Sequence, residues 1–162
     1  MRLLVAAAAL IPALALAQPA GPQRKAGWWE MTMSMTAPMA MTQTLQICTD
    51  ASVEKPGQAF GPMNQRGDCS AGPIVPDAGG WRFSTTCKAG TMTIETSGTA
   101  RGDFGSSYHV DAVTRMSPAP MPQMAESHTT IDAKWLGACP AGKKPGDVVV
   151  AGRTMSMGRP PG

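Results

Sequence analysis

The chain has 162 residues, with 14 Lys and Arg against 11 Asp and Glu, and its formal net charge is +3. This length allows one small domain, and so small a net charge lacks the dense basic footprint of a nucleic-acid-binding protein. There are 18 glycines and 15 prolines, which predicts many turns, but the alternating segments between them argue against a wholly unstructured chain. We therefore expect a β-rich domain with flexible termini and no nucleic-acid partner.

Residues 1–17 have the three parts of a secretory signal peptide. Arg2 supplies the positive charge, residues 3–16 form an apolar run, and Ala17 ends the small-residue pattern that precedes cleavage. The apolar run is shorter than the roughly 20 residues of a transmembrane helix, and it contains Pro12. We therefore predict cleavage after Ala17, export, and a protein that does not span a membrane.

The clearest strand signal follows a polar lead-in at 18–26, which we expect to be flexible. From Trp29 to Thr36 apolar and polar residues alternate strictly, which is the pattern of a half-buried strand. The side chains predicted to share its apolar face are Trp29, Met31, Met33 and Met35.

Five more segments are predicted as strands, with turn residues between them. They span 41–48, 80–87, 91–99, 106–115 and 126–135. Residues 49–55 are compatible with one helical turn, and 148–150 with one more short strand. The connections suit hairpins and are too short for most crossover helices. The predicted fold is therefore mostly β, a single antiparallel meander of about six strands with little helix, partly closed into a barrel. It would occupy residues 27–150, and 151–162 are expected to be a disordered tail.

The four cysteines are expected to form two disulfides, because an exported chain with an even cysteine count meets an oxidising compartment. They are Cys48, Cys69, Cys87 and Cys139. Three pairings are open. A Pro/Gly-rich turn at 72–80 favours pairing Cys69 with Cys87, which leaves Cys48 for Cys139. No Cys-x-x-Cys pair or zinc-finger spacing is present, so structural bridges are favoured over a redox or metal role.

Several segments together resemble a family of bacterial exported proteins, the domain of unknown function 3617. They are the leader, 27–32, a Met/Pro loop, 46–49, Cys69, 81–87 and 135–147. The family commonly opens with Pro-Gly-x-Trp-Glu; here Ala26 stands where proline is usual, and the tryptophan is doubled at Trp28 and Trp29. The resemblance implies an exported protein of the Gram-negative periplasm. It implies no activity, and it transfers no catalytic or ligand-binding residue.

Methionine is unusually frequent, with 13 in the chain. Thioethers are soft ligands suited to Cu(I), and alternate strand positions place neighbouring sulfurs on one face. The candidate copper ligands are Met35, Met39 and Met41, of which the last two lie at a Pro/Ala loop. Core packing is the stronger reading for the inward methionines, because methionine fills irregular cores. No other cofactor is expected.

Catalysis is not expected, because the sequence offers no convergent acid/base set and no nucleophile motif. His109 and Asp111 would lie on one strand face and could share a hydrogen bond, and His128 is the other histidine. Such a pair is common without catalysis.

The remaining function class is a non-catalytic binding or structural module of the cell envelope, with unknown partners. A curved sheet with inward aromatic and aliphatic side chains could hold a small apolar ligand, although the same side chains are also the expected core. They are Trp29, Trp81, Phe83, Tyr108, Ile131 and Trp135.

Overall fold

The computed structural model describes residues 21–54, 60 and 68–156. Within these residues ten strands form a single antiparallel sheet, and a short 3-10 turn, η2 (Pro122–Met124), lies between the seventh and eighth strands. The strands are β1 (Gly27–Met35), β2 (Met41–Thr49), β3 (Asp68–Ala71), β4 (Val75–Asp77), β5 (Gly80–Ala89), β6 (Met92–Gly102), β7 (Ser107–Ser117), β8 (Glu126–Gly137), β9 (Asp147–Val150) and β10 (Arg153–Ser156).

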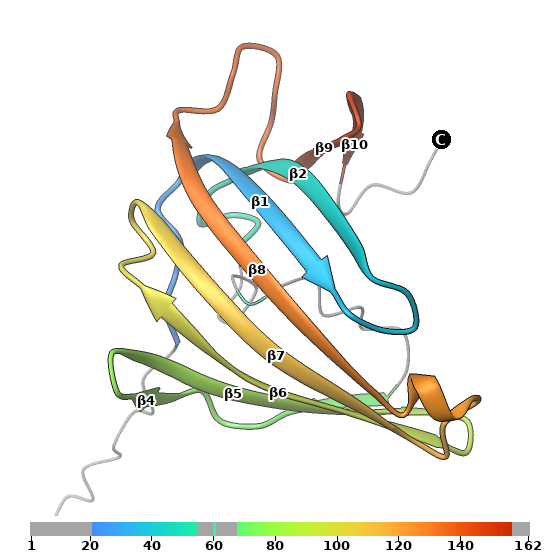
Figure 1. Ribbon diagram of the computed structural model, residues 1–162. Coiled ribbons are helices and arrows are strands. Elements are labelled where there is room, and N and C mark those ends of the chain that lie inside the picture. Colours follow the sequence, from blue (N-terminus) through green and yellow to red (C-terminus); the bar gives the residue numbers. More distant parts are fainter. Residues whose placement is uncertain (1–20, 55–59, 61–67, 157–162) are drawn as a thin grey trace, which may run out of the picture.

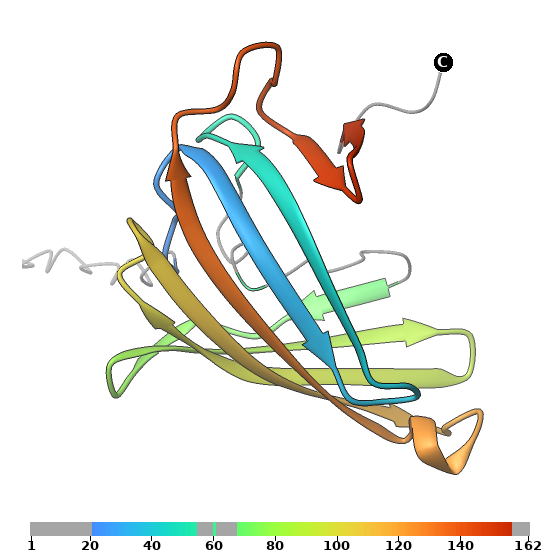
Figure 2. The same cartoon turned by 45° about the horizontal axis from the view of Figure 1, so that its top comes forward.

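The strands are ordered β10-β9-β2-β1-β8-β7-β6-β5-β3, and β4 also pairs with β5. Strands β5 to β8 follow one another as a meander, and β1 then pairs with β8. The sheet curls strongly, so that β1, β2 and β8 rise steeply from β5 and β6 (Figures 1 and 2). Its edge strands β10 and β3 do not pair with each other. The mostly β, antiparallel prediction is thus confirmed, but the sheet is an open trough and has ten strands instead of about six.

The register explains the two faces of the sheet. Trp29 on β1 lies opposite Ile47 on β2 and Trp135 on β8, and Met31 lies opposite Leu45 and Ala133. Because successive side chains point to opposite faces of a strand, these residues share the inner, concave face. The outer face carries the intervening polar residues.

The core fills the inner face at one end of the trough. Phe60 stacks on Phe83 with ring centroids 4.6 Å apart, and Phe104 stacks on Tyr108 at 4.9 Å. The inward side chains predicted from the sequence are in this cluster or packed against it, except Met35, which lies beyond it on β1. The buried members are Trp29, Met31, Ile47, Phe60, Phe83, Ala100, Phe104, Tyr108, Val110, Ile131, Ala133 and Val148.

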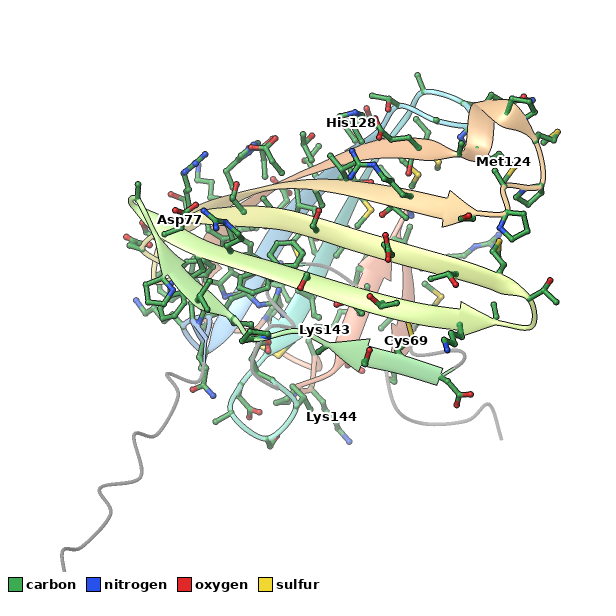
Figure 3. The ribbon with its side chains drawn as sticks, turned by 90° about the horizontal axis from the view of Figure 1, so that it is seen from below. Cys69, Asp77, Met124, His128, Lys143 and Lys144 are labelled. Atoms are coloured by element: carbon green, nitrogen blue, oxygen red, sulfur yellow. A yellow bond between two sulfur atoms is a disulfide. The ribbon has the colours of Figure 1, made fainter. Side chains whose placement is uncertain are left out.

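Two disulfides tie the sheet together, in the pairing that the turn at 72–80 favoured. The long bridge joins Cys48 on β2 to Cys139 after β8, and the short bridge joins Cys69 to Cys87. The last two residues are direct register partners on β3 and β5. Seen from below, Cys69 and Asp77 lie near opposite ends of β5 (Figure 3). Strand β3 pairs with one end of β5 and β4 pairs with the other.

Both ends of the described chain differ from the prediction. The lead-in was expected to be flexible, but Arg24 is buried and the Lys25 N–H donates to the Phe104 carbonyl oxygen at 2.8 Å. The tail was expected to be disordered from residue 151, but 153–156 form β10, whose Ser156 hydroxyl donates to Asp147 at 2.6 Å. The described parts of both segments are held by tertiary contacts, which a local sequence pattern does not predict. The predicted signal peptide, residues 18–20 of the lead-in and residues 157–162 lie outside the described residues.

The remaining short elements also bear on the sequence analysis. Strands β3 and β4 were not predicted, because they are only four and three residues long and β4 contains a proline. The apolar run at 148–150 is part of β9. One helical turn is present after β2, where the Glu54 N–H donates to the Asp50 carbonyl oxygen at 2.9 Å. Residue 55 of that expected turn lies outside the described residues.

Candidate functional site

A buried ion pair closes one end of the trough. Arg24 donates from Nε and Nη2 to the two carboxylate oxygens of Glu54, at 2.9 and 2.7 Å. Both side chains are 4% exposed. Glu54 also accepts from the Thr49 hydroxyl at 2.8 Å, and Arg24 Nη1 donates to the Tyr108 hydroxyl at 3.4 Å and lies 3.3 Å from the Met31 sulfur. The lead-in is therefore anchored into the core by a charged group.

This network is complete within the protein. Burial raises the pKa of Tyr108 to about 12, against the opposing effect of the Arg24 charge, so its hydroxyl stays protonated at neutral pH. Burial also acts to lower the pKa of Arg24, but the hydrogen bond to Glu54 and the nearby oxygens outweigh it, so the pKa is raised. Among the described residues no buried side-chain nitrogen or oxygen lacks a hydrogen-bond partner. Each buried polar atom of the ion pair therefore has a partner within the protein.

The inner face continues beyond the core toward the tip of the β1–β2 hairpin. There its apolar side chains are partly exposed, in contrast to the buried aromatic end. Thr96 and Thr114 lie among them on the same face, and their hydroxyl oxygens are 2.9 Å apart. We call this part of the trough the open end; its apolar members are Met33, Met35, Leu45, Ile94, Ala112 and Met116.

The three candidate copper ligands meet at the β1–β2 hairpin. Met35 and Met41 are direct cross-strand partners, so their side chains start on the same face at neighbouring positions. Met39 lies in the connecting loop and is 77% exposed, and Met41 is 52% exposed. The sequence reasoning grouped these residues by spacing, and the hairpin brings them to one end of the molecule.

His109 lies on the outer face between two carboxylates. Its Nε2 is 3.2 Å from Asp111 on the same strand, the pair found in the sequence, and its Nδ1 is 2.7 Å from Asp132 on β8. The hydrogen bond to Asp132 raises the pKa of His109, against partial burial, and Asp111 adds to the rise. The sequence reasoning missed Asp132, because finding it needs the register of β8 against β7.

The other histidine is also engaged with a carboxylate. His128 Nε2 lies 3.2 Å from Glu126, near the end of β8 that follows η2 (Figure 3). At both histidines each carboxylate contacts a single ring nitrogen. Within residues 21–54, 60 and 68–156 no three His, Cys, Asp or Glu side chains are grouped to hold a metal ion. All four cysteines are bonded in the two bridges, so none is a free thiol.

The helical content of the described chain is small. No helix in it has the length and apolar character that crossing a membrane requires.

Comparison with known proteins assigns the chain to one family. The chain matches no curated protein, and it matches no solved structure. A family model described as "Protein of unknown function (DUF3617)" matches residues 24–139. That match begins at the buried Arg24 and ends at the second cysteine of the long bridge, so it covers the ion pair, both bridges and strands β1 to β8. The chain therefore belongs to the DUF3617 family, whose function is unknown.

Proposed function

We propose that this protein is a non-catalytic, exported binding module that holds a small apolar ligand in the open end of its trough. The observation that carries the proposal is the change in exposure along the inner face. The same rows of side chains are fully buried at the aromatic end and partly exposed at the open end. Ligand pockets are typically concave and mostly apolar with a few polar groups, and Thr96 and Thr114 supply such groups here.

The state of the titratable groups supports a non-catalytic role. A general base needs a free nitrogen or oxygen near the proton that it removes, and both nitrogens of His109 are occupied by carboxylates. The only charged groups buried in the described core, Arg24 and Glu54, neutralise each other.

Export to the periplasm is part of the same proposal. It is supported by the leader sequence at residues 1–17 and by the two bridges, since disulfides persist in oxidising compartments such as the bacterial periplasm.

The ligand site is tested with N-phenyl-1-naphthylamine, an uncharged probe whose fluorescence rises in apolar surroundings. Wild-type protein is expected to bind it, and Met33→Gln and Met116→Gln are each expected to weaken binding about tenfold, the factor for about 1.4 kcal/mol of lost apolar contact. Thr32→Gln on the outer face of the same strand is the matched control and should bind as wild type. No binding, or equal losses in all three variants, would refute the apolar site.

A second candidate function is Cu(I) binding at the β1–β2 hairpin. It is favoured by one observation, the direct opposition of Met35 and Met41 beside the exposed Met39. Replacing Met39 and Met41 together by alanine should abolish a preference for Cu(I), measured by competition with a Cu(I) chelator. Met121→Ala, at an exposed methionine between β7 and β8, is the control. Unchanged affinity in the double variant would eliminate this site.

A further inference from the structure

The outer face carries a depression that neither candidate function uses. It has a volume of about 700 Å³ and lies over the ends of β6, β7 and β8. Its charged lining residues are Glu30, Arg101, His109, Asp132 and Lys134. These five side chains come from four neighbouring strands, and all belong to the polar set of the alternating pattern.

The carboxylates of this depression are already engaged by the protein. Asp132 is bonded to His109 at 2.7 Å, and Glu30 accepts from the Gln46 side-chain amide at 3.0 Å. The second carboxylate at His109, Asp111, lies 3.2 Å from the other ring nitrogen. Each of these carboxylates is thus held in place by a contact within the protein.

Two cations of the depression are held less tightly. Among the described residues neither Arg101 nor Lys134 is within ion-pair distance of a carboxylate, and both are exposed. Arg101 acts electrostatically on Asp77, and Lys134 lies opposite Glu30 on the neighbouring strand. Arg101 is the register partner of His109 on β6, while Lys134 is two residues beyond Asp132, the partner of His109 on β8. The two side chains thus start on the strands on either side of His109, with their Cα atoms about 12 Å apart from the strand spacing and the offset of two residues, which is within the reach of two long side chains.

The rim of the depression is held in place before any ligand arrives. Asp103 accepts hydrogen bonds from the backbone N–H groups of Gly105, Ser106 and Ser107 at 2.8, 2.7 and 3.2 Å, and from the Ser106 hydroxyl at 2.7 Å. The Ser106 carbonyl oxygen accepts from the Trp135 N–H at 2.8 Å, which ties this loop to β8. A fixed rim reduces the ordering cost of binding.

We propose that the depression binds a small anion through a phosphate or carboxylate group, with Arg101 and Lys134 as the direct donors and the His109 imidazole beside them. Charge-assisted hydrogen bonds from guanidinium and ammonium groups are the strong contacts for both kinds of anion. The proposal is independent of the apolar site, which lies on the opposite face of the sheet.

Isothermal titration calorimetry with sodium phosphate and with sodium malonate, at neutral pH and low chloride, tests the site directly. Wild-type protein is expected to bind at least one of them, and Arg101→Gln and Lys134→Gln are each expected to weaken binding about tenfold or more. Lys88→Gln, which removes an exposed cation from β5, is the matched control and should leave binding unchanged. Equal weakening in the control, or no weakening in the other two variants, would overturn the proposal.

A second arm identifies the source of the anion. The same proteins are sedimented with vesicles of phosphatidylglycerol. Vesicle binding that depends on Arg101 and Lys134, without binding of free anions, would assign the site to a lipid headgroup; binding of free anions alone would assign it to a soluble ligand. Absence of both would refute the site. The Arg101→Gln and Lys134→Gln variants should still bind N-phenyl-1-naphthylamine as tightly as the wild-type protein does. That outcome would distinguish a loss of anion binding from a loss of the apolar site.

Discussion

Removing the acidic partner of the buried ion pair is expected to cost the protein a large part of its stability. In Glu54→Gln the guanidinium of Arg24 stays buried without a compensating charge, because both side chains are only 4% exposed. Breaking a buried pair from one side typically costs about 3 to 5 kcal/mol, out of a total of about 5 to 15 kcal/mol for a domain. The midpoint of thermal unfolding should fall by about 2 to 4 °C for each kcal/mol in a chain of this size.

Removing both charges should restore most of this loss. In Arg24→Met combined with Glu54→Leu no charge remains buried, and apolar replacements of buried pairs are often neutral or stabilising. The Thr49 and Tyr108 hydroxyls lose one partner each, so we expect the recovery to be incomplete by about 1 to 2 kcal/mol. The double variant is nevertheless predicted to be more stable than Glu54→Gln.

Urea unfolding of the oxidised proteins, followed by tryptophan fluorescence, measures these differences. Arg82→Met is the control, because Arg82 forms an exposed ion pair with Asp77 at 3.0 Å, and exposed pairs contribute little. The reasoning is refuted if Glu54→Gln is no more destabilised than this control. It is also refuted if the double variant is as unstable as Glu54→Gln, since the loss would then not come from an unpaired charge.

Three further outcomes are expected. Replacing both cysteines of the long bridge, which spans 91 residues, should cost about 4 to 5 kcal/mol in urea unfolding, against about 3 kcal/mol for the 18-residue short bridge; the reverse order would contradict the loop-closure argument. Gly98→Ala should destabilise by about 1 to 3 kcal/mol, because its Cβ would clash with the Asp111 carbonyl oxygen and meet the ring of Phe83 at 2.8 Å. Gly105→Ala, with no neighbour closer than 3.8 Å, should unfold as wild type. By NMR titration His109 should have a pKa above about 6.5, and Asp132→Asn should lower that pKa. The stabilisation by the protonated imidazole is fully present below the ordinary pKa and is lost as the pH rises through the raised pKa. An unchanged pKa of His109 in Asp132→Asn would contradict the contact between the two residues.

The alternating pattern was sufficient to predict the position of the long strands. Five of the six expected segments begin within one residue of an observed strand, and the first begins two residues inside β1, because one face of each strand is buried and the other meets water. The inward residues followed from the same pattern. The pattern does not record which edge residues pair, so the short strands β3, β4 and β10 were missed.

The buried ion pair shows what the pattern cannot contain. Arg24 lies in a polar lead-in with no periodicity, and its partner Glu54 is 30 residues away. Each is an ordinary charged residue in its own segment, and the two segments are brought together by the pairing of β1 with β2, which places Gly27 opposite Thr49. Asp132 was missed at His109 for the same reason, because it lies 23 residues away on another strand. The candidate methionines were found because the hairpin that joins them is local.

The depression on the outer face depends on both kinds of information. Alternation places His109 and Lys134 on the polar face, whereas Arg101 lies beyond the predicted segment 91–99, at the end of β6. The proximity of the three residues follows from the register of three strands. The absence of ion-pair partners for Arg101 and Lys134 within the described chain is a property of the folded protein alone.

Native mass spectrometry of the protein isolated from its own cells tests the binding-module account most directly. The account predicts a monomer with two disulfides that carries an organic adduct, and Met33→Gln should lose this adduct while Thr32→Gln retains it. A copper-sized adduct removed by a Cu(I) chelator would support the methionine hairpin instead. A bare monomer from wild-type cells, together with no binding of N-phenyl-1-naphthylamine, would contradict the proposed apolar site.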